Sequence, residues 1–403
     1  MKKTRIKKLY SIAVVFFFSV CLCLGLLFYF RTPVLTAFLG KEKVPVVVVS
    51  GTWEDMGFQI GSRNEFAAGI RRTAWLARRL FPPERARSYF KRVESFIPRS
   101  SLDHMRGIAK GVAAVSDISY DDAWEDILLL NFAYMPAGCT AFAVCSQAGS
   151  YIAHNTDEYY VLTFSQAVIV FNPDNESGYP FVSFGSPAFG GVMMGENTEG
   201  LAAVCNAAFP SDRVLGLPPQ FLVRRSLEEC SSIEDAVRLF TSFVEKGGRF
   251  GYIGYNITYI DFTAGKLARL EIAPDRVEVD YGQAWGEKRF VAAANHYSLM
   301  PGRNQRAEHN TSSYARYERV KLLLKREKSY NTETIVRILA DHDEQRHGTN
   351  HTICRHTNLN KGTCNCLFFD STFTLYYMLG NPCRYSENPQ ALQTIRWTDM
   401  LGR

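Results

Sequence analysis

The sequence predicts an α+β fold in which two stacked sheets are covered by helices. Three observations support this: helical spacing dominates residues 65–134, strand-like alternation begins at Cys139, and strands and helices then follow one another in runs. Such runs favour α+β over a doubly wound parallel sheet. The 403 residues are 46% hydrophobic and 21% charged, with no internal repeat, so we expect one large domain.

The N-terminus has the pattern of a signal anchor. Residues 9–30 are an uncharged apolar run of 22 residues, and about 20 suffice to cross a bilayer. Basic residues in 1–8 then predict a cytoplasmic tail, a transmembrane helix at 9–30, a stalk at 31–43 and a single-pass type II topology with the catalytic domain outside the cytoplasm. A secreted protein is the alternative. However, signal-peptide cores usually have about 7–15 residues, and this run ends in Phe28-Tyr29-Phe30-Arg31, a poor cleavage site.

The remaining charge does not indicate a nucleic-acid partner. The net charge is only +6, and the second basic group, within residues 71–106, comes without an Arg/Gly repeat or zinc-finger spacing. A solvated helix face is the simpler interpretation of these residues.

One strand and four helices are expected before Cys139. Residues 45–50 contain four consecutive valines, which is typical of a buried strand. Helical spacing covers residues 65–79, 84–95, 102–116 and 120–134. Asp121 and Asp122 suit the first turn of the last helix, where carboxylates complement the helix dipole. Pro136-Ala137-Gly138 then ends it.

After residue 138 the pattern is mainly that of strands. Residues 139–145 and 151–155 flank a turn at 146–150 and predict a hairpin. Further strands are expected at 161–171, 179–184, 201–205, 252–261, 267–273, 276–281, 291–295 and within 366–380. Helices are expected at 220–229, 233–246, 314–327 and 332–341.

Gly138-Cys139-Thr140 is the strongest candidate for a functional motif. A cysteine that begins a strand directly after glycine is typical of a precursor that cleaves itself to expose an N-terminal nucleophile. Cleavage between Gly138 and Cys139 would give Cys139 a free α-amino group to serve as the base for its own thiol. The alternative is a small buried cysteine in a strand.

The other cysteines leave the redox state open. Eight cysteines lie outside the apolar N-terminal run, four of them in the tail: Cys354, Cys364, Cys366 and Cys383. In an oxidising compartment some of them would pair, but sequence does not give the connectivity. Cys354-x-His356 and Cys364-x-Cys366 match no familiar structural zinc spacing, so we expect no metal and no cofactor. Four sequons begin at Asn175, Asn256, Asn310 and Asn350.

Polar motifs recur at the ends of the expected strands and at the start of a helix. His154-Asn155-Thr156-Asp157 closes the hairpin, Asn206 and Asn295 each end a later strand, and Arg316 follows Ser312-Ser313 at a helix start. In this order they resemble the acyl-coenzyme A:6-aminopenicillanic acid acyltransferase family and, more distantly, the bile-salt and penicillin V amide hydrolases. The resemblance covers residues 46–385. It includes the leader motifs in 51–61 and 106–111 and the tail motifs in 353–356 and 380–383.

The resemblance implies a four-layer αββα N-terminal-nucleophile (Ntn) hydrolase fold and self-cleavage before Cys139. Residues 44–138 and 139–403 would become the two chains of an enzyme acting on small acyl-amides or acyl-thioesters. By position, Cys139 matches the nucleophile and Asp157 the aspartate that binds its amino group. Asn206 matches an oxyanion-hole residue, Asn295 a second active-site asparagine, and Arg316 an arginine near the nucleophile.

These roles agree with the chemistry. A neighbouring cation lowers a thiol's pKa, and an α-amine that titrates near pH 8 can accept a proton at neutral pH. One oxyanion-hole donor such as Asn206 contributes roughly 3–4 kcal/mol in comparable sites. His154 departs from the pattern because bile-salt-type enzymes carry an arginine there. Stabilisation of the thiolate is therefore expected to be weaker or pH-dependent.

The sequence leaves three questions about function open. Hydrolysis and acyl transfer share one acyl-enzyme, and sequence does not separate them. A papain-like protease would use Cys139, His296 and Asn295, but such enzymes place the cysteine at a helix N-terminus. A membrane-anchored, non-enzymatic binding protein on the same fold is the third. Residues 207–222, rich in Pro and Phe, are either a wall of an apolar acyl pocket or an ordinary loop.

Overall fold

A computed structural model describes residues 44–133, 138–159, 166–174, 177–304, 311–356 and 361–402. The expected anchor at 9–30 and the stalk at 31–43 lie outside these residues, so the membrane topology stays a prediction. No helix in the part of the chain that the structure describes has the length and apolarity needed to span a bilayer.

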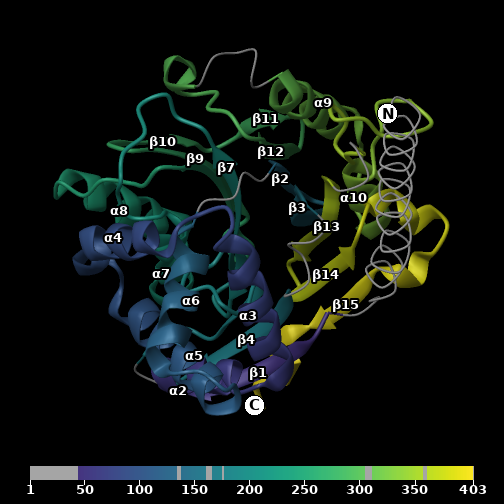
Figure 1. The fold of residues 1–403 in the computed structure, drawn as a ribbon. Coiled ribbons are helices and arrows are strands. Elements are labelled where there is room, and N and C mark those ends of the chain that lie inside the picture. The colour runs from purple at the N-terminus through teal and green to yellow at the C-terminus, as the bar shows by residue number, and fades with distance from the viewer. Residues whose placement is uncertain are drawn as a thin grey trace, which may run out of the picture. The chain divides into compact units, whose positions relative to one another are not determined.

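Two sheets organise the described residues (Figure 1). One has eight strands, in spatial order β1 (Val46–Gly51), β4 (Ala167–Pro173), β5 (Phe181–Gly185), β6 (Met194–Asn197), β7 (Leu201–Ala208), β8 (Gly254–Asp261), β9 (Lys266–Ala273) and β10 (Arg276–Asp280). The other has seven, in the order β11 (Gln283–Trp285), β12 (Lys288–Ala293), β2 (Gly138–Ser146), β3 (Gly149–Tyr159), β13 (Lys361–Asp370), β14 (Thr374–Leu379) and β15 (Gln393–Arg396). Neighbouring strands are antiparallel except for β1 and β4.

Helices cover the outer face of each sheet. The first group is α2 (Trp53–Gly61), α3 (Asn64–Ala77), α4 (Pro83–Val93), α5 (Arg99–Val115), α6 (Tyr120–Phe132), α7 (Gln220–Glu229) and α8 (Ile233–Glu245), which pack on the eight-stranded sheet. The second group, α9 (Thr311–Arg326) and α10 (Thr332–Leu339), packs on the seven-stranded sheet. The order of layers is therefore helices, sheet, sheet, helices, which confirms the expected α+β class.

The alternation along β2 shows how the sequence builds these layers. Ala141 and Ala143 belong to the core between the two sheets, whereas Phe142 and Val144 belong to the core under α9 and α10. Successive side chains of a strand point to opposite faces, so a strand with both faces covered is apolar at every position. The small alanines on the inner face let the two sheets approach closely at the point where β2 carries Cys139.

Helix α2 was not expected from the sequence, and glycine explains both its packing and the missed prediction. Gly57 and Gly61 on α2 face Gly107 and Gly111 on α5, and a Cβ at any of the four would overlap with the backbone of the other helix. Glycine lowers helix propensity by about 1 kcal/mol relative to alanine. Here it permits a close helix crossing, so tertiary packing overrides the local preference. The leader motifs therefore encode a helix–helix contact.

Most other expected elements are confirmed, with small differences. Ser119 caps α6 as a side-chain acceptor for the N–H of Asp122, and α6 ends at Phe132, just before β2. β3 extends to Tyr159, beyond the predicted end at 155, because it pairs with both β2 and β13. The short strands β6, β11 and β15 were not expected.

Two of the four sequons begin at described residues, and their asparagines differ in exposure to solvent. Asn256 is buried in β8, where its side chain donates to two backbone carbonyls, so this fold leaves no room for a glycan on it. Asn350 is exposed in the loop before β13. The sequons at Asn175 and Asn310 begin at positions outside the described residues.

Candidate active site

The β2–β3 hairpin places the predicted nucleophile opposite the predicted aspartate. Gly138 pairs with Asp157 and Cys139 with Thr156 across the two antiparallel strands. Cys139 and Asp157 are both buried. The register of the hairpin therefore brings Cys139 close to Asp157, although the two residues lie on different strands.

Asn295 holds the backbone of Cys139. It follows the end of β12, and its Oδ1 accepts a hydrogen bond of 2.9 Å from the N–H of Cys139. The same Oδ1 accepts a 2.7 Å bond from Nη2 of Arg316, while its Nδ2 donates to the carbonyl of Ala207 at 2.8 Å. The nitrogen that self-cleavage would release thus already has a fixed acceptor in the intact chain.

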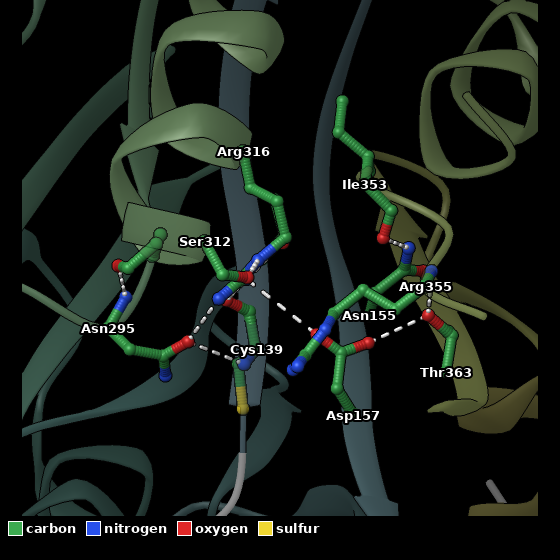
Figure 2. Close-up of polar contacts among 12 residues, drawn as sticks. Cys139, Asn155, Asp157, Asn295, Ser312, Arg316, Ile353, Arg355 and Thr363 are labelled. Atoms are coloured by element: carbon green, nitrogen blue, oxygen red, sulfur yellow. Dashed lines mark hydrogen bonds and ion pairs between the residues drawn. The ribbon is translucent and has the colours of Figure 1, made fainter. Parts of the chain in front are cut away.

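Arg316 connects both sides of the site. It lies on α9, and Figure 2 shows its guanidinium between Asn295 and Asp157. Nη1 donates to the Cys139 carbonyl and to Oγ1 of Thr140 at 2.6 Å, and it lies 3.6 Å from Oδ2 of Asp157. Burial lowers the pKa of Arg316 to about 10, while Asp157 opposes the shift, so the side chain stays charged at neutral pH.

Asp157 has further partners that were not singled out in the sequence. Nη1 of Arg355 lies 3.3 Å from its Oδ2, and Oγ1 of Thr363 donates to its Oδ1 at 2.7 Å (Figure 2). The N–H of Arg355 donates to the same Thr363 hydroxyl at 2.8 Å. Two guanidinium groups therefore face the Asp157 carboxylate, and the charge of Arg316 also acts on the Cys139 thiol. The only sequence signal was the tail motif that contains Arg355.

Asn206 lies next to the site, but its side chain hydrogen-bonds to a backbone carbonyl of β12. Its Nδ2 donates to the Ala293 carbonyl at 3.3 Å, and its buried Oδ1 has no hydrogen-bond partner. Its partner in the β7–β8 register, Asn256, donates in the same way to the carbonyls of Ala294 and His296 at 3.0 and 2.8 Å. These two asparagines join the eight-stranded sheet to the end of β12 and so fix the position of Asn295.

His154 and His296 are both poor candidates for the base that would take the thiol proton. Burial lowers the pKa of His154 to about 4, and its ring bonds to the Cys205 carbonyl at 3.1 Å and the Thr156 hydroxyl at 3.3 Å. Burial also lowers the pKa of His296 to about 4, and its Nδ1 bonds to Oγ of Ser313 at 2.7 Å. A ring with so low a pKa accepts a proton only weakly at neutral pH, and both ring nitrogens of His154 already have hydrogen-bond partners. Cys139 moreover begins a strand, unlike the helix N-terminus that the papain-like alternative needs.

The thiol of Cys139 is strongly disfavoured as a thiolate in the intact chain. Burial raises its pKa to about 12, and the carboxylates of Asp157 and Glu158 add to the shift. Arg316 and the N–H of Ala207, which hydrogen-bonds to the sulfur, oppose it. A donor is therefore already directed at the sulfur from the neighbouring sheet.

Cys139 forms part of the wall of an apolar cavity of about 210 Å³. Side chains from the helical leader and from both sheets line it, including Phe132, Phe189, Met193, Met194 and Tyr255. The volume is below the roughly 300–1,000 Å³ of sites for drug-sized ligands. The cavity therefore suits a small apolar group held against the sulfur.

The predicted pocket wall at 207–222 contributes only in part. Ala207, Pro218, Pro219 and Gln220 line the cavity, whereas Phe221 is buried in the core under the helices. Most of the apolar lining comes instead from residues outside 207–222, such as Phe132, Phe189 and Met193.

These features define an α+β protein with a buried, strand-initiating cysteine between two sheets. The family model for acyl-coenzyme A:6-aminopenicillanic acid acyl-transferase matches residues 145–384, more than half of the chain. The chain therefore belongs to that family, as the sequence motifs predicted. The matched region contains Asp157, Asn206, Asn295, Arg316 and Arg355. It begins after Cys139. No curated protein matches the chain in sequence.

Several solved structures are distantly similar. An N-acylethanolamine-hydrolyzing acid amidase ortholog from Caenorhabditis elegans is 14% identical, with a TM-score of 0.40 over 58% of this chain and 93% of that one. A mutant of the conjugated bile acid hydrolase from Clostridium perfringens is 13% identical, with a TM-score of 0.42 over 64% and 92%. Penicillin V acylase from Agrobacterium tumefaciens is 14% identical, with a TM-score of 0.38 over 60% and 83%.

Proposed function

We propose that this protein is a self-processing acyl-amide hydrolase or acyltransferase in which Cys139 carries the acyl group. One observation supports this most strongly. The backbone N–H and carbonyl of Cys139 are bonded to Asn295 and Arg316, while the residue itself forms part of the wall of an apolar cavity. A merely structural cysteine would not require two buried polar side chains to fix its backbone.

Self-processing would begin with attack of the Cys139 sulfur on the carbonyl carbon of Gly138. A carbon–sulfur bond forms and the carbon–nitrogen bond breaks, with the thiol proton passing to the departing amine. Water then hydrolyses the thioester to give a Gly138 carboxylate and a free Cys139 thiol. The nitrogen set free is the one that already donates to Asn295.

In the mature enzyme this α-amine takes the proton from the thiol. Its ordinary pKa near 8 makes it a suitable base at neutral pH. Asn295 orients the amine, and the positive charge of Arg316 favours the thiolate against the opposing charges of Asp157 and Glu158. The sulfur attacks the substrate carbonyl, the amine returns the proton to the leaving nitrogen, and an acyl-thioester remains on Cys139.

The oxyanion of the tetrahedral intermediate needs fixed N–H donors near the sulfur. The N–H of Ala207 is such a donor because it already bonds to the thiol. Asn206 was expected in this role, but one of its N–H groups is directed at the Ala293 carbonyl. We therefore assign the oxyanion donor to the Ala207 backbone and give Asn206 a role in positioning Asn295.

The substrate class follows from the cavity. Its aromatic and thioether lining suits an apolar acyl group of modest size linked through an amide. Water accepts the acyl group in hydrolysis, and a second amine accepts it in transfer. Both outcomes use the same acyl-enzyme.

The test uses purified full-length protein and a series of p-nitroanilides with straight acyl chains of increasing length. We expect release of p-nitroaniline from the shorter apolar acyl chains and an acyl adduct on Cys139 by mass spectrometry. Cys139→Ala should abolish both. Cys145→Ala removes a thiol from the same strand, away from the Cys139 backbone contacts. This variant should retain both the release of p-nitroaniline and the acyl adduct. Turnover by Cys139→Ala at the rate of the unaltered protein would refute the assignment.

A further inference from the structure

A second cluster of reactive side chains lies outside the proposed active site. It consists of His342, Cys354, His356 and Cys383, whose possible ligand atoms all lie within 4.8 Å of one another. His342 follows α10, Cys354 and His356 lie in the loop before β13, and Cys383 lies in the short 3-10 helix η5 (Pro382–Ser386). Three separate segments therefore contribute to one small cluster.

The spacing within the cluster matches tetrahedral zinc coordination. Nε2 of His356 lies 3.4 Å from Sγ of Cys354 and 3.5 Å from Sγ of Cys383. Zinc binds sulfur at about 2.3 Å and imidazole nitrogen at about 2.0–2.1 Å, so tetrahedral angles separate the two ligand atoms by roughly 3.5–3.6 Å. Two thiolates and two imidazoles are also a complete ligand set for a closed structural zinc site.

The surroundings of the cluster also point to a ligand. Nε2 of His342 is buried without a hydrogen-bond partner. The rings of His342 and His356 meet edge to face with centroids 4.9 Å apart. A Cβ at Gly348 would lie 2.5 Å from the ring of His356 and 2.9 Å from that of His342, so glycine is needed for both rings to converge. Burying an unpaired imidazole nitrogen is unfavourable unless something binds it.

A neighbouring amide completes the arrangement. Nδ2 of Asn381 donates to the Cys354 sulfur at 3.8 Å and to the Arg355 carbonyl at 2.9 Å. Amide donors to ligating sulfurs are typical of the outer shell of metal sites, where they hold the ligand and share its charge.

We propose that His342, Cys354, His356 and Cys383 bind one Zn²⁺ ion. The two thiolates neutralise the charge of the ion, which suits the partly buried location. This differs from the expectation of no metal, which considered only the pairs close in sequence. Cys364 and Cys366, the other pair in the tail, are not part of the cluster.

The position of the site gives it a purpose in the proposed enzyme. Two of its ligands, Cys354 and His356, flank Arg355, the residue whose side chain lies against Asp157. Zinc would fix the backbone on both sides of Arg355 and so hold its guanidinium at the aspartate. This purpose rests on the proposed function, whereas the metal site itself does not.

The same cysteines offer a competing chemistry, since Cys354 and Cys383 are close enough to raise the question of a disulfide. Both are free thiols in the structure. A disulfide would form with loss of two protons and two electrons to an oxidant, and it would remove both thiolates from the zinc site. The two states therefore exclude each other and have different masses.

The experiment measures metal content and thiol state on the purified full-length protein. Elemental analysis should find about one zinc per chain, and denatured, unreduced protein should retain the thiols of Cys354 and Cys383. Cys383→Ser should lose the zinc. Cys366→Ala, which changes a buried cysteine of β13 outside the cluster, should keep it. These readouts do not depend on acyl-amide turnover.

A second measurement covers the case in which Cys383→Ser does not fold. The zinc of the unaltered protein is removed with a chelator and replaced by Co²⁺. We expect the visible bands of tetrahedral cobalt and a thiolate-to-cobalt charge-transfer band. Absence of metal together with a Cys354–Cys383 disulfide, or cobalt bound with octahedral bands and no charge transfer, would overturn the proposal.

Discussion

Arg355 and Asp157 form a buried pair, with Nη1 of the arginine 3.3 Å from Oδ2 of the aspartate. The two residues are 198 positions apart in the chain. β3 carries the aspartate, and the arginine comes from the loop that precedes β13, the neighbour of β3 in the sheet. The pair joins the strand that faces Cys139 to the C-terminal segment, so it links the candidate active site to the tail.

Replacing this arginine should therefore destabilise the fold. Loss of one partner from a buried ion pair typically costs about 3–5 kcal/mol, and Asp157 keeps Arg316 and Thr363, so we expect Arg355→Gln to lower the free energy of unfolding by about 3 kcal/mol. Urea denaturation measures this free energy of unfolding. Arg337→Gln breaks the exposed pair with Glu327 and should cost about 1 kcal/mol or less. Equal losses in the two variants would contradict the importance of the buried pair.

Gly138 is expected to matter for self-processing because of its neighbours. A Cβ at this position would overlap with Nη1 of Arg355 and lie 3.2 Å from Cβ of Asp157. Gly138→Ala should displace the guanidinium and slow cleavage, as followed by gel electrophoresis of freshly synthesised protein. Gly302→Ala places its methyl group in open space and should cleave at the normal rate. Normal cleavage of Gly138→Ala would show that the packing around Gly138 is irrelevant to processing.

Asn295 should be essential for turnover. Asn295→Ala removes the acceptor for the Cys139 nitrogen and for Nη2 of Arg316 in one step. We expect kcat/KM for the acyl-amide to fall about 100-fold or more, the loss typical when a preorganised polar group is removed from such a site. Circular dichroism checks that the variant is folded. A loss of less than tenfold in folded protein would argue against this arrangement of the site.

The pH dependence of self-processing follows from the thiol of Cys139. Burial raises its pKa to about 12, so below that value the thiolate fraction grows with pH, roughly tenfold per unit. The rate of precursor cleavage should therefore increase across the neutral range. His154 stays neutral there because burial lowers its pKa to about 4, so His154→Gln should leave the slope unchanged. A rate that falls as pH rises, or a slope lost in His154→Gln, would contradict this account.

The sequence was sufficient for the class of fold and for the residues nearest the nucleophile. The alternation after Cys139 defined β2, and the ordered motifs named Asp157, Asn295 and Arg316, which the structure brings around Cys139. These residues lie near the ends of strands or near the start of a helix, and such positions are visible in a linear pattern. The class of fold and the family are confirmed, while the catalytic roles stay predictions.

The remaining parts depend on tertiary structure. Arg355 and Thr363 reach Asp157 only through the pairing of β13 with β3, which shifts register between Thr363 and Asn365. No local pattern encodes that irregularity. The lining of the cavity comes from elements on both sides of Cys139 in the chain, so its composition could not be read from one segment. His342 and Cys383 likewise come close to Cys354 and His356 only in the folded chain, because the four residues belong to three separate segments.

The most direct test of the account is the N-terminal sequence of the mature protein. Full-length chain is expressed, left to process, and resolved under denaturing conditions. We expect two fragments, one of which begins Cys-Thr-Ala-Phe at Cys139, and we expect Cys139→Ala to remain a single chain. A fully active protein that stays uncleaved between Gly138 and Cys139 would show that Cys139 does not work as an N-terminal nucleophile.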